Sequence, residues 1–75
     1  MQFYLTIKNA ACATVFEQYF DTFGESQAAM RRAPGWFKGP HLVEVWLGDT
    51  LVAWMATETG VIHFADAARV KVVRG

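Results

Sequence analysis

The stretch Thr14–Ala33 reads TVFEQYFDTFGESQAAMRRA, and a set of mainly apolar positions in it recurs at steps of three and four residues. These positions are Phe16, Tyr19, Phe20, Phe23, Gln27 and Met30. The spacing predicts a long helix with one aromatic face, because an α-helix returns to the same side about every 3.6 residues. Thr14 followed by Glu17 matches a capping box at the start of that helix, and Gly24 within it allows a kink or a break.

The segment after the predicted helix, APGWFKGP (Ala33–Pro40), contains two glycines, two prolines and two aromatic residues. Pro34 and Gly35 are expected to end the helix, because proline restricts the residue before it and glycine readily adopts the conformation that terminates a helix. We interpret the segment as a corner that leads into the next strand. Trp36 or Phe37 is expected to close the open end between helix and sheet.

Strand patterns flank the predicted helix on both sides. Before it, Gln2–Lys8 alternates between two sets of side chains, which predicts a half-buried strand. After it, His41–Met55 contains two runs rich in β-branched and aromatic residues around Gly48–Asp49. This pattern predicts a hairpin with a two-residue loop that begins with glycine.

The predicted hairpin has two apolar faces. Its expected pairs are Leu47–Thr50, Val45–Val52 and Val43–Trp54. The opposite face then carries Leu42, Trp46, Leu51, Ala53 and Met55. Glu44 is the exception to this apolar character. Since one layer of helices covers only one face of a sheet, the second face is expected to meet another subunit, and the sequence predicts a homodimer.

Residues 57–68, TETGVIHFADAA, fit either a helix or a strand. A helix over Glu58–Ala68 places Val61 and Phe64 on one stripe, and the alanines favour it. The alternative is a strand over Val61–Phe64 after a Thr-Gly turn. We predict the helix, followed by a last strand at Arg69–Val73 (RVKVV).

The expected element order is therefore β-α-β-β-α-β, in one α+β domain that spans residues 1–75. The ferredoxin-like plan has this order, with a four-stranded antiparallel sheet and helices on one face.

The composition restricts the function classes. Of the 75 residues, 53% are apolar, and seven Lys and Arg balance seven Asp and Glu. A balanced charge argues against a nucleic-acid binder, which needs a basic face. The single cysteine, Cys12, excludes an intrachain disulfide and indicates a reducing compartment. No segment has the apolar length of a membrane span, so we expect a cytoplasmic protein.

Several segments resemble the dimeric α+β-barrel superfamily, which includes antibiotic-biosynthesis-type monooxygenases and haem-degrading enzymes. FYLTIK lies where that family has its first strand, and VFEQYFDTFGESQAAMRRAPGW is similar to its long first helix with a Pro-Gly-aromatic corner. LVAWMATE resembles its third strand, which ends in a Trp before a helix, and VIHFADA resembles the short helix after that Trp. The resemblance implies two subunits whose sheets pack into a barrel, with a small pocket between sheet and helices in each subunit.

The candidate site consists of His63, Trp54, Tyr19 and Trp36. His63 is the candidate catalytic group, which would orient or deprotonate an aromatic ligand, and the other three residues would bind that ligand. No metal is expected, because no Cys, Asp or Glu at ligand spacing accompanies His41 or His63. No cofactor is expected either, because His63 lies earlier than the histidine of the haem-binding members of the superfamily.

Two hypotheses of different classes follow, and they leave open whether the protein is an enzyme. The first is a small homodimeric α+β-barrel protein that binds an apolar or aromatic ligand, with cofactor-independent monooxygenase chemistry as its enzymatic form. The second is a non-catalytic interaction module, such as a small inhibitor or adaptor, that uses an exposed apolar sheet face. A buried cavity holding His63 favours the first hypothesis. A filled core beside an exposed aromatic sheet face favours the second.

Overall fold

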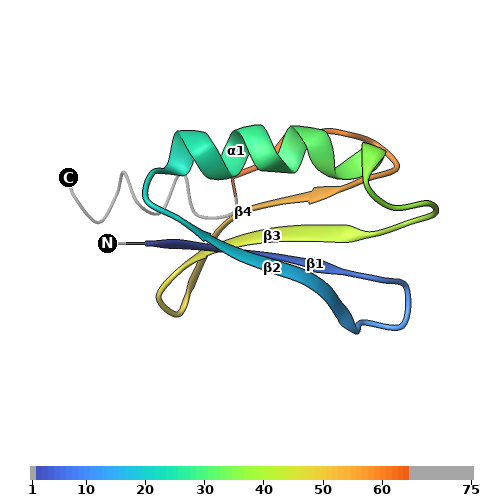
Figure 1. The fold of residues 1–75 in the computed structure, drawn as a ribbon, viewed down its shortest axis with the longest axis horizontal. Helices are drawn as coiled ribbons and strands as arrows, with labels where there is room; N and C mark the ends of the chain where they lie inside the picture. Colours follow the sequence, from blue (N-terminus) through green and yellow to red (C-terminus); the bar gives the residue numbers. More distant parts are fainter. Residues whose placement is uncertain (1, 65–75) are drawn as a thin grey trace.

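The computed structural model of the chain describes residues 2–64. It consists of an antiparallel sheet with a helix on one face (Figure 1). The strands are β1 (Phe3–Lys8), β2 (Thr14–Phe20), β3 (Leu42–Leu47), β4 (Thr50–Ala56) and β5 (Ile62–His63). The helices are α1 (Phe23–Arg32) and the short 3-10 helix η1 (Ala33–Gly35). The five strands follow the order β2-β1-β3-β4-β5. The α+β class and the antiparallel sheet expected from the sequence are thus confirmed.

The first part of the predicted long helix is the strand β2. Its sequence, TVFEQYF, consists mainly of β-branched and aromatic residues, which suit a pleated sheet. Phe16 and Phe20 lie opposite Ile7 and Phe3 of β1. A spacing of four residues fits one turn of a helix and also two repeats of a strand, so this pair of aromatics did not distinguish the two structures. The predicted capping box of Thr14 and Glu17 is wrong, because both residues lie in β2.

The loop that makes β2 possible is Asn9–Ala13, which joins β1 to β2. The Asn9 side-chain oxygen accepts hydrogen bonds from the backbone N–H groups of Ala11 and Ala13, at 2.9 and 3.0 Å. Cys12 has a φ of 65°, and its N–H donates to the Asn9 carbonyl at 2.9 Å. An asparagine that bonds its own downstream backbone can therefore close a tight turn that contains no glycine.

α1 begins at Phe23 rather than near Thr14. Its capping box consists of Thr22 and Glu25: the Thr22 hydroxyl accepts from the Glu25 N–H, and the Glu25 carboxylate accepts from the Thr22 N–H, both at 3.2 Å. The motif was present in the sequence, eight positions after the one that we selected. The helical segment ends with η1 at Gly35, as the Pro-Gly pair predicted.

The capping box gives a direct test of where the helix begins. Thr22→Ala is expected to lower the free energy of unfolding by about 1 kcal/mol, because the Glu25 N–H loses its side-chain acceptor. Thr14→Ala is the matched control, since the Thr14 side chain is exposed in β2 and its loss should cost less than about 0.5 kcal/mol. Chemical denaturation at equal protein concentration measures both values. A larger loss for Thr14→Ala would contradict the helix boundary.

The connection β2-α1-β3 joins two parallel strands that have β1 between them. This split β-α-β arrangement is one half of the ferredoxin-like plan, but here the strand in the middle comes first in the sequence. The order of elements within residues 2–64 is β-β-α-β-β-β, not the predicted β-α-β-β-α-β, and the sheet has five strands rather than four. The difference follows from β2, which replaces the first part of the predicted long helix, and from β5, which lies where the second helix was predicted.

The β3–β4 hairpin has the predicted Gly-first loop, with Gly48 at a φ of 61°, but a bulge changes its register. The observed pairs are Leu47–Thr50, Trp46–Leu51, Val45–Ala53, Glu44–Trp54 and Val43–Met55. The predicted pairs Val45–Val52 and Val43–Trp54 are therefore wrong. Val52 is the extra residue of the bulge, and a bulge lets a strand change which face its later side chains occupy. As a result, Ala53 and Met55 face α1 and Trp54 faces away from it.

The described part of segment 57–68 is turn and strand. Ile62 and His63 pair with Met55 and Trp54 of β4, so the helix predicted over residues 58–68 is wrong for residues 58–64. The strand alternative is correct at Ile62–His63. Gly60 has a φ of 69°, which a continuing helix does not accommodate. Residues 65–68 of the predicted helix and the predicted strand at residues 69–73 lie outside the described residues.

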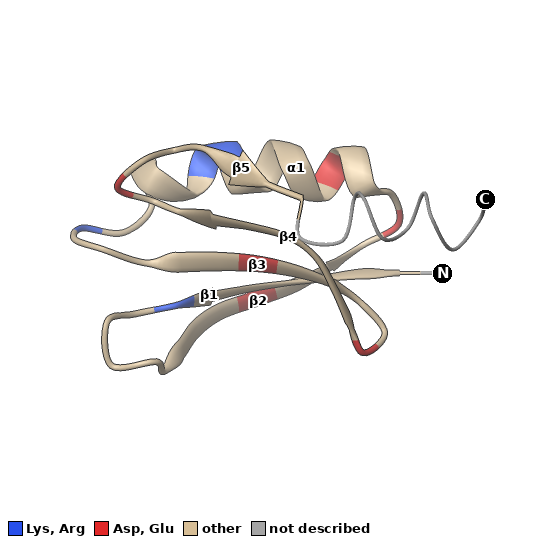
Figure 2. Ribbon diagram, turned by 180° about the vertical axis from the view of Figure 1, so that it is seen from behind, with Lys and Arg blue, Asp and Glu red and all other residues tan. Residues whose placement is uncertain are grey.

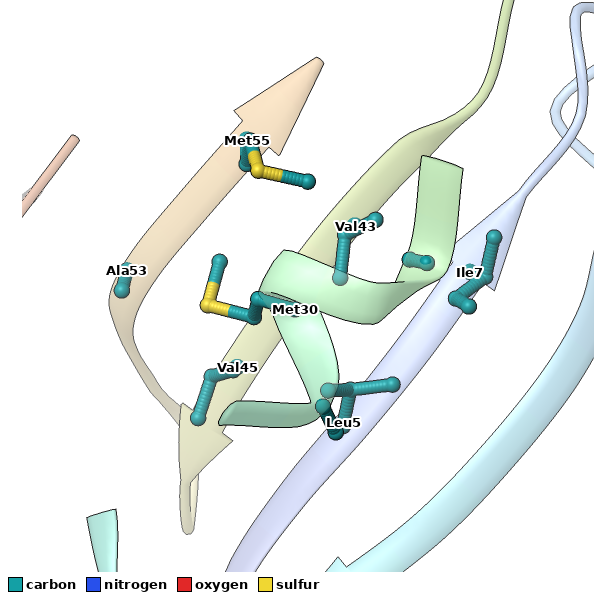
Figure 3. Close-up of a cluster of buried hydrophobic side chains, with 9 residues drawn as sticks. Leu5, Ile7, Met30, Val43, Val45, Ala53 and Met55 are labelled. Atoms are coloured by element: carbon teal, nitrogen blue, oxygen red, sulfur yellow. The ribbon is translucent and has the colours of Figure 1, made fainter. Parts of the chain in front are cut away.

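The core lies between α1 and the sheet (Figure 3). Its buried side chains are Leu5, Ile7, Ala29, Met30, Ala33, Val43, Val45, Ala53 and Met55. Figure 3 shows Met30 of α1 projecting toward β3 and β4, and alanines at several contact positions let the helix approach the sheet closely. Phe37 packs against this core while Trp36 is 42% exposed. Of the two candidates, Phe37 closes the corner.

Candidate functional site

The face of the sheet that points away from α1 carries one ring from each of the five strands. The rings are Tyr19 (β2), Tyr4 (β1), Trp46 (β3), Trp54 (β4) and His63 (β5). We call this surface the open face; it also includes Thr6, Lys8, Glu17, Leu42 and Glu44. Its composition follows from strand alternation: β1 buries Leu5 and Ile7 beneath α1 and so turns Tyr4 to the other side. The register keeps the set together, since Tyr4 lies opposite both Tyr19 and Trp46.

Four of the rings form two stacked pairs. The ring centroids of Tyr4 and Tyr19 are 4.7 Å apart with an interplanar angle of 29°, and those of Trp54 and His63 are 4.2 Å apart with an angle of 17°. Neighbouring strands are about 4.8 Å apart, so rings stacked at these distances stand upright on the sheet. Their faces are turned toward each other and their edges toward solvent. Trp46 lies on β3, between the two pairs.

A row of polar side chains runs beside the rings. Thr6 lies opposite Glu17 on one side and Glu44 on the other, and Figure 2 shows the acidic positions of β2 and β3 level with each other. The Thr6 hydroxyl donates to Glu44 Oε1 at 3.4 Å, and Lys8 Nζ lies 3.2 Å from the same oxygen. Glu44 exposes only 13% of its side chain and Lys8 35%. The ion pair is therefore partly shielded from solvent.

Glu17 is paired with the neighbouring aromatic row. The Tyr4 hydroxyl donates a hydrogen bond to Glu17 Oε1 at 2.8 Å. This bond, with smaller contributions from burial and from the charge of Glu17, raises the pKa of Tyr4 above the ordinary value of a tyrosine. Any stability from the bond is thus present below the ordinary tyrosine pKa and is lost as the pH rises through the raised one. Glu44 therefore has an ion-pair partner within the chain, whereas Glu17 accepts a hydrogen bond from the neutral Tyr4 hydroxyl.

The structure brings together some of the site residues predicted from the sequence and separates others. Trp54 and His63 are stacked neighbours. Tyr19 lies on the same open face and is 59% exposed, but three strands separate its strand from that of His63. Trp36 lies on the helix side, where its ring is 5.2 Å from that of Phe16. The four predicted residues therefore do not form one compact site.

His41 has a structural setting at the start of β3. Its backbone N–H donates to the Thr57 hydroxyl at 3.0 Å, and its ring stacks on Phe37 with the centroids 4.9 Å apart. His41 therefore helps to organise the beginning of β3.

Two shallow hollows are lined by described residues. One, of about 380 Å³, lies on the open face and is lined by Tyr4, Thr6, Lys8, Thr14, Trp46, Gly48 and Asp49. The other, of about 430 Å³, lies among the loops near Phe37 and Thr57. His63 lines neither of these two hollows. It lies exposed at the sheet edge, with one face of its imidazole against Trp54.

Sequence reasoning did not include Tyr4, Thr6 and Lys8 in the candidate site, although they belong to the open face. The signal was available, because these residues alternate with the buried positions of β1, and counting every second residue from Tyr4 identifies them. The sequence analysis identified Glu44 as the exception in an apolar strand. Its ion pair with Lys8 could not be predicted, because that requires knowing that β1 and β3 are neighbours in the sheet.

Within residues 2–64, no group of three or more His, Cys, Asp or Glu side chains is placed to hold a metal ion. None of the helical segments in this range has the length and apolar character that crossing a bilayer requires. Comparisons with protein-family models, curated protein sequences and solved structures found no match to the chain.

Proposed function

We propose that the protein is a non-catalytic interaction module that binds another protein surface through the open face. The observation that carries the proposal is the set of five rings, one from each strand, on the face opposite α1. Tyr and Trp are the residues that most often anchor protein interfaces, because each offers a large apolar area with few rotatable bonds. The core beneath α1 contains nine apolar residues at or below 1% exposure.

The orientation of the rings supports a protein surface as the partner. A flat ligand that inserts between two rings needs space between their faces, but one face of Tyr4 already lies against Tyr19 and one face of Trp54 against His63. Upright rings instead present edges and the gaps between them. A surface of ring edges and gaps can interdigitate with the side chains of a second protein surface, as the side chains of two packed sheets do.

The small-ligand hypothesis remains a prediction, together with its monooxygenase form. It requires an enclosed pocket around His63, and the described surroundings of His63 are an exposed edge and the ring of Trp54. The cytoplasmic location expected from the sequence is likewise part of this proposal. The free, exposed Cys12 at the tip of the β1–β2 loop supports a reducing compartment such as the cytoplasm.

A site-specific photo-crosslinker tests the proposed binding surface. Introduced in place of Tyr19 on the open face, it is expected to give covalent adducts in the cell that expresses the protein. The same group in place of Arg31, which is exposed on α1, is the control and should give none. Adding Trp46→Glu to the Tyr19 derivative should abolish the adducts. Adducts from the Arg31 position alone would refute the proposal.

A further inference from the structure

We infer that the edge of β2 that points away from β1 binds an extended peptide segment of another protein as an added strand, with a Lys or Arg opposite Glu17 and apolar residues opposite Phe16 and Phe20. We call this edge the outer edge. The inference goes beyond the proposed function, because it concerns the backbone of β2 and not the rings of the open face. Three observations carry it: the pairing of β2, the charge of Glu17 and the apolar side chains beside it.

The outer edge has backbone groups to offer to an added strand. Within residues 2–64, β2 pairs with β1 alone, so every second residue directs its N–H and C=O away from the sheet. The register with β1 is uninterrupted from Phe16 to Phe20, and β2 contains no Lys or Pro. Lys, Pro, bulges and short length are common means by which an edge strand avoids another chain. β5, at the opposite edge, has only two residues, so β2 is the edge that can accept a strand.

Glu17 gives the outer edge a negative charge. Its Oε1 accepts a hydrogen bond from the neutral Tyr4 hydroxyl at 2.8 Å, and the ion pair within residues 2–64 joins Lys8 to Glu44 instead. The chain has no Lys or Arg between Lys8 and Arg31. Residues directly opposite each other on two strands have Cβ atoms about 4.5–5.5 Å apart, and opposite charges at such positions stabilise the pair. A basic residue opposite Glu17 therefore complements this edge.

The helix side of the outer edge carries apolar side chains. Phe16 and Phe20 are partly buried against the core. The ring of Trp36 lies 5.2 Å from that of Phe16 and is 42% exposed. Because side chains alternate along a strand, residues opposite Phe16 and Phe20 lie on this side, whereas the residue opposite Glu17 lies on the open face. An apolar residue opposite Phe16 is therefore placed beside the pair of aromatic rings.

These positions define the chemistry of the partner segment. When a peptide adds a strand to a sheet edge, the main-chain hydrogen bonds supply affinity and the alternate side chains supply specificity. Antiparallel pairing is slightly more stable per residue than parallel pairing. In that direction the segment has the order apolar, two residues of any kind, Lys or Arg, apolar. An acidic residue at the basic position would be repelled by Glu17.

Amide hydrogen exchange on the full chain, followed by nuclear magnetic resonance, tests the inference with the capped peptide Ser-Ile-Tyr-Thr-Lys-Ile-Ser. At millimolar concentration the peptide is expected to slow exchange of the outward N–H groups of residues 16–20 roughly 5-fold or more. Two N-methylated peptides, modified at opposite sets of alternate residues, are the backbone control. One set faces β2 in the added strand, so one of the two peptides should lose binding and the other should retain it.

A charge exchange tests the position of the basic residue. Glu17→Lys should weaken binding of the Lys-containing peptide roughly 5-fold or more, because an attraction across the strand pair becomes a repulsion. Replacing the peptide Lys with Glu should restore binding to this variant, which also verifies that its edge is folded. Glu58→Lys is the matched control. It changes the net charge equally at an exposed position in the turn before β5, and it should leave binding unchanged.

Several results would overturn the inference. One is unchanged exchange of the β2 amides at millimolar peptide, and another is equal binding of both N-methylated peptides. Slow exchange of the outward amides without peptide would mean that the edge is already paired. This pairing would be within the chain if it is independent of protein concentration, and with a second copy if it increases with concentration. A shift of the Trp46 indole signal without protection of β2 would place the peptide on the open face, which overturns this inference and supports the proposed function.

Discussion

Leu5→Ala is expected to lower the free energy of unfolding by about 2–5 kcal/mol, which is a large part of the stability of so small a domain. Leu5 is fully buried in β1, and β1 is paired on both sides, with β2 and β3. The cavity left by the missing atoms cannot close easily, because strands fix the backbone on either side. Urea unfolding followed by circular dichroism measures the loss.

The neighbouring residue provides the control for this prediction. Tyr4 lies on the open face, so Tyr4→Ala removes its stacking on Tyr19 and its hydrogen bond to Glu17 but leaves no cavity under α1. The expected loss is clearly smaller than that of Leu5→Ala. Both variants must be compared at the same protein concentration. Equal losses at the two positions would contradict the assignment of the two faces of β1.

Met55→Glu is expected to be the second strongly destabilising change. Met55 is fully buried against α1, and a carboxylate there would have no partner among the apolar core residues. A buried, unpaired carboxyl takes up a proton, so its pKa in the folded state rises above the unfolded value. The variant should therefore keep most of its stability below about pH 4.3 and lose about 1.4 kcal/mol for each pH unit above that, up to the raised pKa.

Trp54→Glu is the control, since Trp54 is adjacent in the chain but lies on the open face. Its partner across the strand is Glu44, so the change costs stacking on His63 and adds some repulsion, without burying a charge in the core. Denaturation curves at pH 4 to 8, taken as differences from the wild type, separate the two variants. A steep pH dependence for Trp54→Glu and none for Met55→Glu would mean that the bulge at Val52 does not set the faces as described.

The parts of the fold that the sequence predicted correctly depend on local chemistry. The first strand follows from strict alternation, and the Gly-first loop at Gly48–Asp49 follows from the φ that only glycine adopts readily. The end of α1 follows from the Pro-Gly pair. Each of these signals is contained in a few consecutive residues and is compatible with only one local structure.

The errors arose where two structures share one local pattern. The four-residue spacing of Phe16 and Phe20 fits a helix and a strand equally, and only pairing with β1, which is set by the Asn9 turn, favours the strand. The bulge at Val52 depends on which side chains fill the space beneath α1. A prediction from uninterrupted alternation along β4 therefore assigned Trp54 to the wrong face of the sheet. The same kind of information was missing for the candidate site, because the open face combines residues from five strands whose order is not local.

The place of β1 in the sheet has a consequence for how the chain assembles. β1 can pair with β2 early, since a short loop joins them. Its other edge stays unpaired until β3 is in place, because the paired residues Thr6 and Glu44 are 38 positions apart in the sequence. Contacts between distant positions form slowly, so an early hairpin holds an unpaired and apolar edge for as long as β3 is delayed. Such an edge pairs with strands of other chains. Misassembly during synthesis is thus expected to begin at the strand that becomes the interior of the finished sheet.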